Sequence, residues 1–100
     1  MKYGLSEETI EKINGVLKKH TAVKKAVIYG SRAKGNYKNG SDIDLTLHGS
    51  IDFDELSDID TEIDDLMLPY MLDISRFDKL HNSELIEHIE RIGLPFYTAE

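Results

Sequence analysis

Residues 29–45 read YGSRAKGNYKNGSDIDL, and the fold that we expect is built around this stretch. The short apolar run at residues 26–29 predicts a buried strand that ends at Gly30. Residues 31–35 favour a short helix, and turn-forming residues follow it. From residue 41 to residue 48 apolar and polar residues alternate, which predicts a second strand with one buried face. The stretch therefore indicates a strand, a tight turn and a second strand.

Outward from this stretch, the hydrophobic spacing predicts three longer helices and two further strands. The expected helices are 7–19, 53–67 and 84–92, and the expected strands are 70–77 and 96–97. Strands that alternate with helices in this way predict an α/β (α+β) fold, a small mixed β-sheet with helices packed on one side. With 100 residues, we expect residues 1–100 to form a single domain.

The composition excludes several classes of protein. The chain has no cysteine, which rules out disulfides and thiolate metal sites and agrees with a cytoplasmic location. It lacks an apolar run long enough for a membrane span, and we expect no leader segment and no membrane partner. A net charge of −7 disfavours nonspecific binding of nucleic acid. Carboxylates concentrate in residues 52–65, either as a solvated helix face or as a surface that docks a basic partner.

The turn at Gly30 and Ser31 has the chemistry of an anion site. Backbone N–H groups between a strand and a helix can bind a phosphate, and a glycine allows the phosphate to come close. Arg32 and Lys34 can add positive charge to such a site, or they are ordinary solubilising charges.

Asp42 and Asp44 stand two residues apart on the second predicted strand, so both carboxylates leave the same face. Two adjacent carboxylates repel each other, and a divalent cation with oxygen ligands relieves that repulsion. Asp73 lies on another predicted strand, opposite its buried face, and can supply a third ligand or remain an exposed strand residue. Phosphate-binding amides beside such a metal are the parts that phosphoryl transfer requires.

Other known motifs do not fit the sequence. The glycine spacing of residues 30–35 is that of a P-loop, but Asn36 and Tyr37 replace the required lysine and hydroxyl residue. The acidic run 52–65 lacks the glycine of an EF-hand loop. The four histidines are scattered, so we expect structural or exposed roles for them, and core packing for Tyr29 and Tyr70.

Gly30-Ser31 followed by Asp42-x-Asp44 resembles the signature of the DNA polymerase beta-like nucleotidyltransferase superfamily. The string GSRAKGNYKNGSDIDL is similar to its smallest members, the minimal nucleotidyltransferase (MNT) domains, and the resemblance covers essentially the whole chain. One departure is Lys34, where many relatives have arginine; another is Asn36, where an acidic residue is common.

This resemblance implies a role for each matching position. Gly30 and Ser31 would hold the triphosphate of ATP, assisted by Arg32, Lys34 and Ser41. The catalytic and metal-binding residues would be Asp42, Asp44 and Asp73, which hold two Mg²⁺ ions. Asp73 would also help to deprotonate the hydroxyl that attacks the α-phosphorus, after which pyrophosphate leaves.

The resemblance also implies a partner. MNT domains accompany HEPN proteins as antitoxins, and some transfer AMP to a tyrosine of the HEPN toxin. We therefore expect AMP transfer from Mg-ATP to a hydroxyl of a HEPN-type partner, in a hetero-oligomer. The alternative is a binding module that neutralises its partner by occlusion alone. A third reading is transfer to a small molecule such as an aminoglycoside, which a chain this short disfavours.

Overall fold

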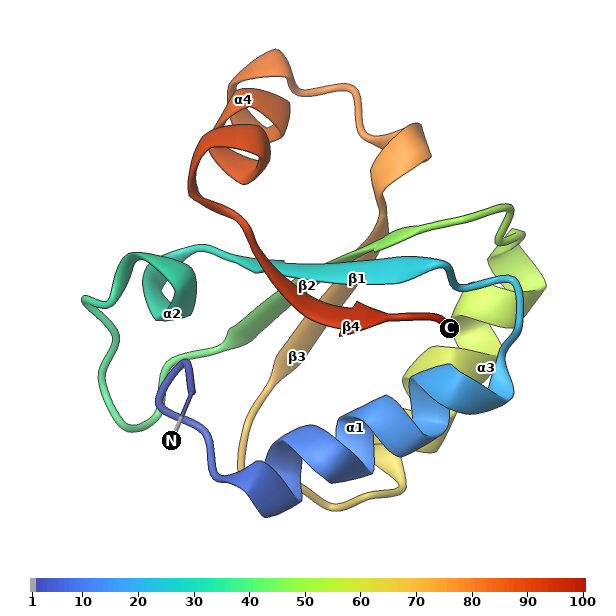
Figure 1. Cartoon of the computed structure of the whole chain (residues 1–100), viewed down its shortest axis with the longest axis horizontal. Coiled ribbons are helices and arrows are strands. Elements are labelled where there is room, and N and C mark those ends of the chain that lie inside the picture. Colours follow the sequence, from blue (N-terminus) through green and yellow to red (C-terminus); the bar gives the residue numbers. More distant parts are fainter. Residues whose placement is uncertain (1) are drawn as a thin grey trace.

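The computed structural model describes residues 2–100, which form one four-stranded sheet with four α-helices around it (Figure 1). The strands are β1 (Lys25–Tyr29), β2 (Ile43–His48), β3 (Leu72–Arg76) and β4 (Leu94–Thr98). The helices are α1 (Glu7–Lys19), α2 (Ser31–Lys34), α3 (Phe53–Asp64) and α4 (Ser83–Ile92), with a 3₁₀ turn, η1 (Phe77–Lys79), after β3. None of the helices in this described part is both long and apolar enough to cross a membrane.

The sheet is mixed, as predicted, and its strand order is β3-β2-β1-β4. β1 runs antiparallel to β2 on one side and to β4 on the other, whereas β2 and β3 are parallel. A parallel pair needs a crossover connection, and α3 provides it between β2 and β3. This crossover places β3, which is distant in sequence from β1, on the same sheet as the Gly30 turn.

The helix boundaries follow from local chemistry. The side chain of Ser6 accepts the Thr9 N–H at 3.2 Å and begins α1, and Asn82 begins α4 in the same way, as the sequence predicted. The predicted helix 53–67 was too long, because α3 ends at Asp64. Its last turn carries carboxylates and no basic residue, which the negative end of the helix dipole disfavours.

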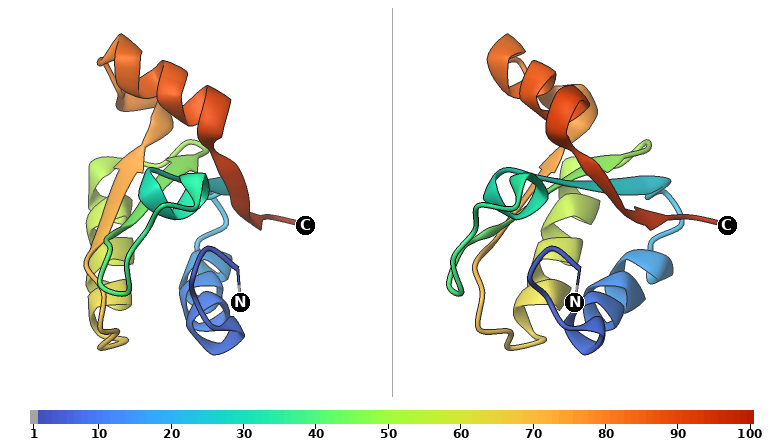
Figure 2. Two further views of the ribbon diagram at one scale, coloured as in Figure 1. Left: turned by 90° about the vertical axis from the view of Figure 1, so that its left-hand side faces the viewer. Right: turned by 60° about the vertical axis from the view of Figure 1, so that its left-hand side comes forward.

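The helices cover both faces of the sheet, which corrects the prediction that they pack on one side. On one face Ile28, Leu45 and the other core residues pack against α1 and α3. On the opposite face Val27 and Tyr29 pack against Ile89 of α4 in a smaller cluster. Figure 2 shows α4 on the side of the sheet away from α1 and α3.

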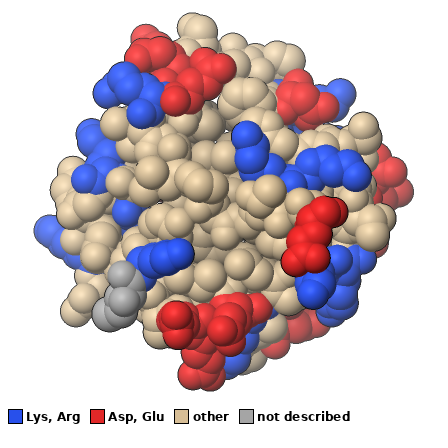
Figure 3. All heavy atoms as spheres, viewed as in Figure 1, with Lys and Arg blue, Asp and Glu red and all other residues tan. Residues whose placement is uncertain are grey.

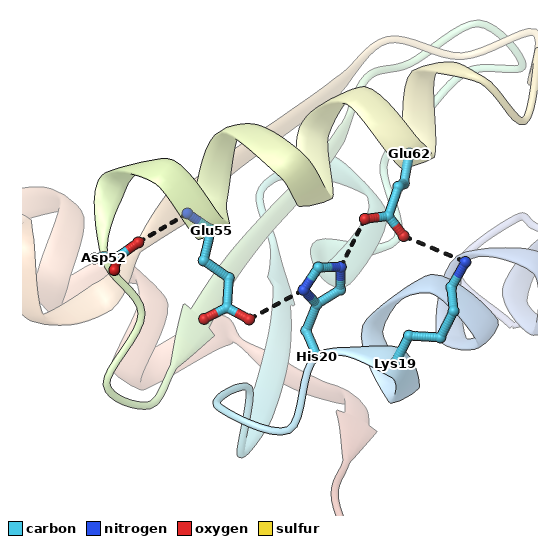
Figure 4. Close-up of polar contacts among 5 residues, drawn as sticks. All are labelled: Lys19, His20, Asp52, Glu55 and Glu62. Atoms are coloured by element: carbon cyan, nitrogen blue, oxygen red, sulfur yellow. Dashed lines mark hydrogen bonds and ion pairs between the residues drawn. The ribbon is translucent and has the colours of Figure 1, made fainter.

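A polar cluster joins α1 to α3 at the edge of the main core (Figure 4). His20, which caps the end of α1, contacts Glu55 through Nδ1 at 3.0 Å and Glu62 through Nε2 at 2.8 Å. Lys19 pairs with the other oxygen of Glu62 at 3.2 Å. Burial alone would lower the pKa of His20, but the two glutamates outweigh this effect and raise the pKa. The charged imidazolium is therefore stabilised between the two helices.

Candidate active site

The Gly30 turn and the two aspartates of the motif meet where β1 ends and β2 begins. Tyr29, the last residue of β1, is paired with Asp44 of β2. Gly30 follows with a φ of +74°, a conformation that L side chains rarely adopt. A Cβ at this position would also collide with the carboxylate of Asp44. Glycine is therefore required here both by the backbone and by the close approach of the acid.

The parallel pairing of β2 and β3 brings the third aspartate to the same place. Asp73 lies directly beside Asp44 in the register, so their side chains leave the same face of the sheet. This is the face that carries α4. Asp42 stands just before β2 and is exposed, as is Asp73, while Asp44 is partly buried. The structure thus brings the three predicted carboxylates to one end of adjacent strands.

The carboxylates repel one another in the absence of a cation. Partial burial raises the pKa of the Asp44 carboxyl, and the charges of Asp73 and Asp42 raise it further, while the nearby His88 opposes the rise. A divalent ion would remove this repulsion, and carboxylate oxygens are the donors that Mg²⁺ prefers. Within residues 2–100 no three acidic, histidine or cysteine side chains already stand close enough to form a metal cage. The aspartates therefore fit Mg²⁺ by chemistry and by strand position, and their side chains must converge to bind it.

The structure corrects the assignment of Arg32 to the triphosphate. Its side chain is 2% exposed, and its guanidinium donates to the Ser41 carbonyl at 2.9 and 3.1 Å and to the Tyr3 carbonyl at 2.9 Å. The group also lies over the rings of Tyr37 and Tyr70, at 5.3 and 4.9 Å from their centroids. With its donors turned inward, Arg32 supports the loop before Asp42 instead of facing a ligand.

The other residues assigned to the nucleotide remain at the surface of this region. Lys34 is exposed at the end of α2, and Ser31 is half-buried at its start. The hydroxyl oxygen of Ser41 accepts the Lys38 N–H at 2.8 Å, which closes the turn before β2. Figure 3 shows lysine and arginine atoms gathered over α2 and the loop that follows it. A nucleotide role for Ser31, Lys34 and Ser41 stays a prediction.

Two further residues border the carboxylates, and the sequence reasoning did not include them in the site. His88 of α4 accepts the Gly30 N–H through Nε2 at 3.1 Å, so this amide is engaged and not free as we expected. Tyr29 is buried, as expected of a core residue, but it shares the face of the aspartates. Burial raises the pKa of Tyr29, a hydrogen bond with Ser75 opposes the rise, and Asp73 and Asp44 add to it.

The sequence pattern does indicate which face of α4 carries His88. It stands at helical spacing from Leu85 and Ile92 and next to Ile89, which places it on the apolar, sheet-facing side of α4. A histidine on that side contacts whatever the neighbouring strand presents. Here the strand presents Tyr29, whose ring meets the imidazole edge to face at 6.1 Å.

Comparison with known proteins agrees with this geometry. The family model described as "Polymerase beta, Nucleotidyltransferase" matches residues 11–100. The chain belongs to this nucleotidyltransferase family. The nucleotidyltransferase family and the mixed-sheet α/β fold predicted from the sequence are therefore confirmed.

One curated protein and several solved structures are similar to this nucleotidyltransferase domain. The protein named "Putative protein adenylyltransferase MJ0604", from Methanocaldococcus jannaschii, is 37% identical over 54 residues, a match that covers 53% of this chain and 54% of that protein. The chain thus matches about half of the length of this relative.

The solved structures agree with the fold. A toxin–antitoxin structure with AMP-PNP has a TM-score of 0.70 at 15% identity, covering 96% of this chain and 76% of that one. The toxin–antitoxin MntA-HepT has a TM-score of 0.67 at 12% identity, covering 94% of this chain and 74% of that one. At such low identity these structures support the fold alone.

Proposed function

We propose that this nucleotidyltransferase domain transfers AMP from Mg-ATP to a hydroxyl group of a HEPN-type partner protein that it inhibits. The observation that carries the proposal is the register of the sheet, which sets Asp44 beside Asp73 and directly against Gly30. The name of the Methanocaldococcus relative supports a protein acceptor, and the MntA-HepT structure supports a toxin as that acceptor.

The residues divide the reaction between them. Asp42, Asp44 and Asp73 would hold the divalent ions, which neutralise the phosphate charge and activate the α-phosphorus. Gly30 and the turn after it would hold the triphosphate tail through backbone amides.

Asp73 is exposed, so an incoming hydroxyl can reach it. Its carboxylate would accept the hydroxyl proton as the oxygen attacks the α-phosphorus. The new bond joins that oxygen to AMP, the bond between the α-phosphorus and its bridging oxygen breaks, and pyrophosphate leaves.

The test uses the purified chain, the protein encoded beside it and two forms of labelled ATP. Label in the α-phosphate should appear on the partner, whereas label in the γ-phosphate should not, because that phosphate leaves with pyrophosphate. Asp42→Asn together with Asp44→Asn should abolish the labelling. The matched control is Asp60→Asn with Asp64→Asn, which removes two exposed carboxylates of α3.

The competing reading is neutralisation by occlusion alone. The engaged amide of Gly30 favours it, because the nucleotide site is partly closed in the free chain. Equal inhibition of the partner by the wild type and by the Asp42/Asp44 variant, with no transfer of label, would establish occlusion and refute the transferase.

A further inference from the structure

The hydrogen bond between Gly30 and His88 joins two parts of the molecule that the motif does not connect. Gly30 donates its N–H to Nε2 of His88, which lies 58 residues later in the chain. Because Nε2 is the acceptor, the neutral imidazole carries its proton on Nδ1. Nε2 of His88 therefore occupies the position that a triphosphate oxygen would need in order to accept a hydrogen bond from the Gly30 N–H.

The surroundings of His88 hold the imidazole in place. Its ring stands edge-on to the ring of Tyr29, with an interplanar angle of 79°. Its helix is anchored by Ile89, which is buried against Val27 and Tyr29. The bond from the Gly30 backbone to the His88 side chain is thus part of the contact between α4 and the end of β1.

We infer that His88 is a positioning residue that holds the Gly30 amide until the triphosphate of the substrate replaces it. This inference rests on the proposed function, and it adds a residue that the family motif does not contain. A backbone amide has one hydrogen, so it cannot serve the imidazole and a phosphate oxygen at full strength together. The phosphate oxygen is charged, and charge-assisted hydrogen bonds are about twice as strong as neutral ones, so the exchange favours the nucleotide.

The exchange has two consequences. The free chain binds nucleotide more weakly than it would with an open amide, by about two- to tenfold, which is the usual worth of one such hydrogen bond. Binding of the triphosphate also breaks the hydrogen bond that joins His88 of α4 to the active-site turn. What remains is the small apolar cluster around Val27, Tyr29 and Ile89, so α4 is the element that responds to the nucleotide.

A direct test measures the hydrogen bond itself in the wild-type chain. An N–H···N bond transmits a scalar coupling between its two nitrogens, so ¹⁵N-labelled protein should show coupling between the Gly30 amide nitrogen and Nε2 of His88. We expect the coupling without nucleotide and its loss when Mg-ATP saturates the chain. If Mg-ATP binds and the coupling survives, the inference is wrong while the proposed function stands.

Affinity measurements on variants give the second test, with Mg-ATP as the probe. His88→Leu should bind about two- to tenfold more tightly than the wild type. His88→Gln, whose side-chain oxygen can accept the same amide, should stay nearer to the wild type. His81→Leu changes an exposed histidine just before α4 and should change nothing.

Unchanged or weaker binding by His88→Leu would overturn the inference, since it would mean that His88 does not compete with the nucleotide. Should His88→Leu fail to fold, the coupling in the wild type decides alone. Absence of Mg-ATP binding by every form would refute the proposed function and the inference with it.

Discussion

Replacement of Arg32 by methionine tests the clearest difference between the sequence analysis and the structure. Methionine keeps much of the apolar length of the side chain and removes every donor. If Arg32 is a buried support, the variant should lose stability. If Arg32 were a phosphate ligand, as its place in the motif suggested, the variant should lose nucleotide affinity and keep its stability.

The magnitude follows from the contacts of the guanidinium. Its removal leaves the carbonyls of Ser41 and Tyr3 without this donor, at about 1–3 kcal/mol for each. Loss of the two ring contacts adds about 1–2 kcal/mol. Methionine carries no charge, so the variant avoids the cost of burying the guanidinium charge, which offsets several kcal/mol of this loss. We expect a net loss of about 3 kcal/mol, which is a large share of the roughly 5–15 kcal/mol that stabilises a domain.

Urea unfolding measures this loss. With a denaturant slope of about 1.5 kcal/mol/M, the midpoint of Arg32→Met should fall by roughly 2 M. Arg32→Lys keeps the charge but cannot donate to both carbonyls as the guanidinium does, so its midpoint should lie between those of the wild type and Arg32→Met. Lys34→Met, on the exposed side of the same short helix, should unfold within about 0.5 kcal/mol of the wild type. An Arg32→Met chain of normal stability with impaired nucleotide binding would refute the structural role.

Three further predictions concern Gly30, the polar cluster in which His20 joins α1 to α3, and the carboxylate of Asp44. Gly30→Ala should cost at least about 1 kcal/mol, because of its positive φ and its contact with Asp44, and should abolish transfer. Its control, Gly15→Ala, lies in open space within α1 and should stabilise the chain by about 0.5–1 kcal/mol in the same thermal melt. The folded-state pKa of His20 is raised above its ordinary 6.5, so its contribution is complete below that pH and is lost as the pH rises through the folded value. The wild type's advantage over His20→Gln in unfolding free energy should therefore shrink as the pH rises above 6.5 and through the folded-state pKa, and a constant difference would contradict the role of the imidazolium. Asp44→Asn should raise the melting temperature of the metal-free chain, because the pKa of Asp44 is raised in the folded state and its ionisation therefore destabilises the fold. The same variant should reduce any stabilisation by Mg²⁺. A lower melting temperature would show that the carboxylate is needed for folding.

The order and type of the elements could be predicted from the sequence because each signal is local. Caps such as Ser6 and Asn82 and the alternation within β2 depend on neighbouring residues only. The side of the sheet on which a helix packs is not local in this way. Even so, residues 26–29 are apolar without alternation, which indicates a strand buried on both faces. Helices on both sides of the sheet were implied by that run.

The part of the site that follows from strand pairing could be predicted from the sequence. The glycine turn directly follows β1, so Gly30 comes against Asp44 whenever β1 and β2 pair, and the α3 crossover brings Asp73 to the same end. His88 could not be placed by this logic, because its contact depends on how α4 packs on the sheet. A prediction of that contact requires the tertiary fold and not the motif.

The misassignment of Arg32 has a more instructive cause. Arg32 and Lys34 were given one role because both are basic and both follow the turn. Residues two apart on a helix, however, point about 160° away from each other, so they cannot both face the same phosphate. The structure turns Arg32 inward and Lys34 outward. Arg32, the residue that points inward, donates to the Ser41 carbonyl just before Asp42 and so fixes the strand that carries the aspartates. Any effect of Arg32 on catalysis should therefore follow from its effect on the position of β2.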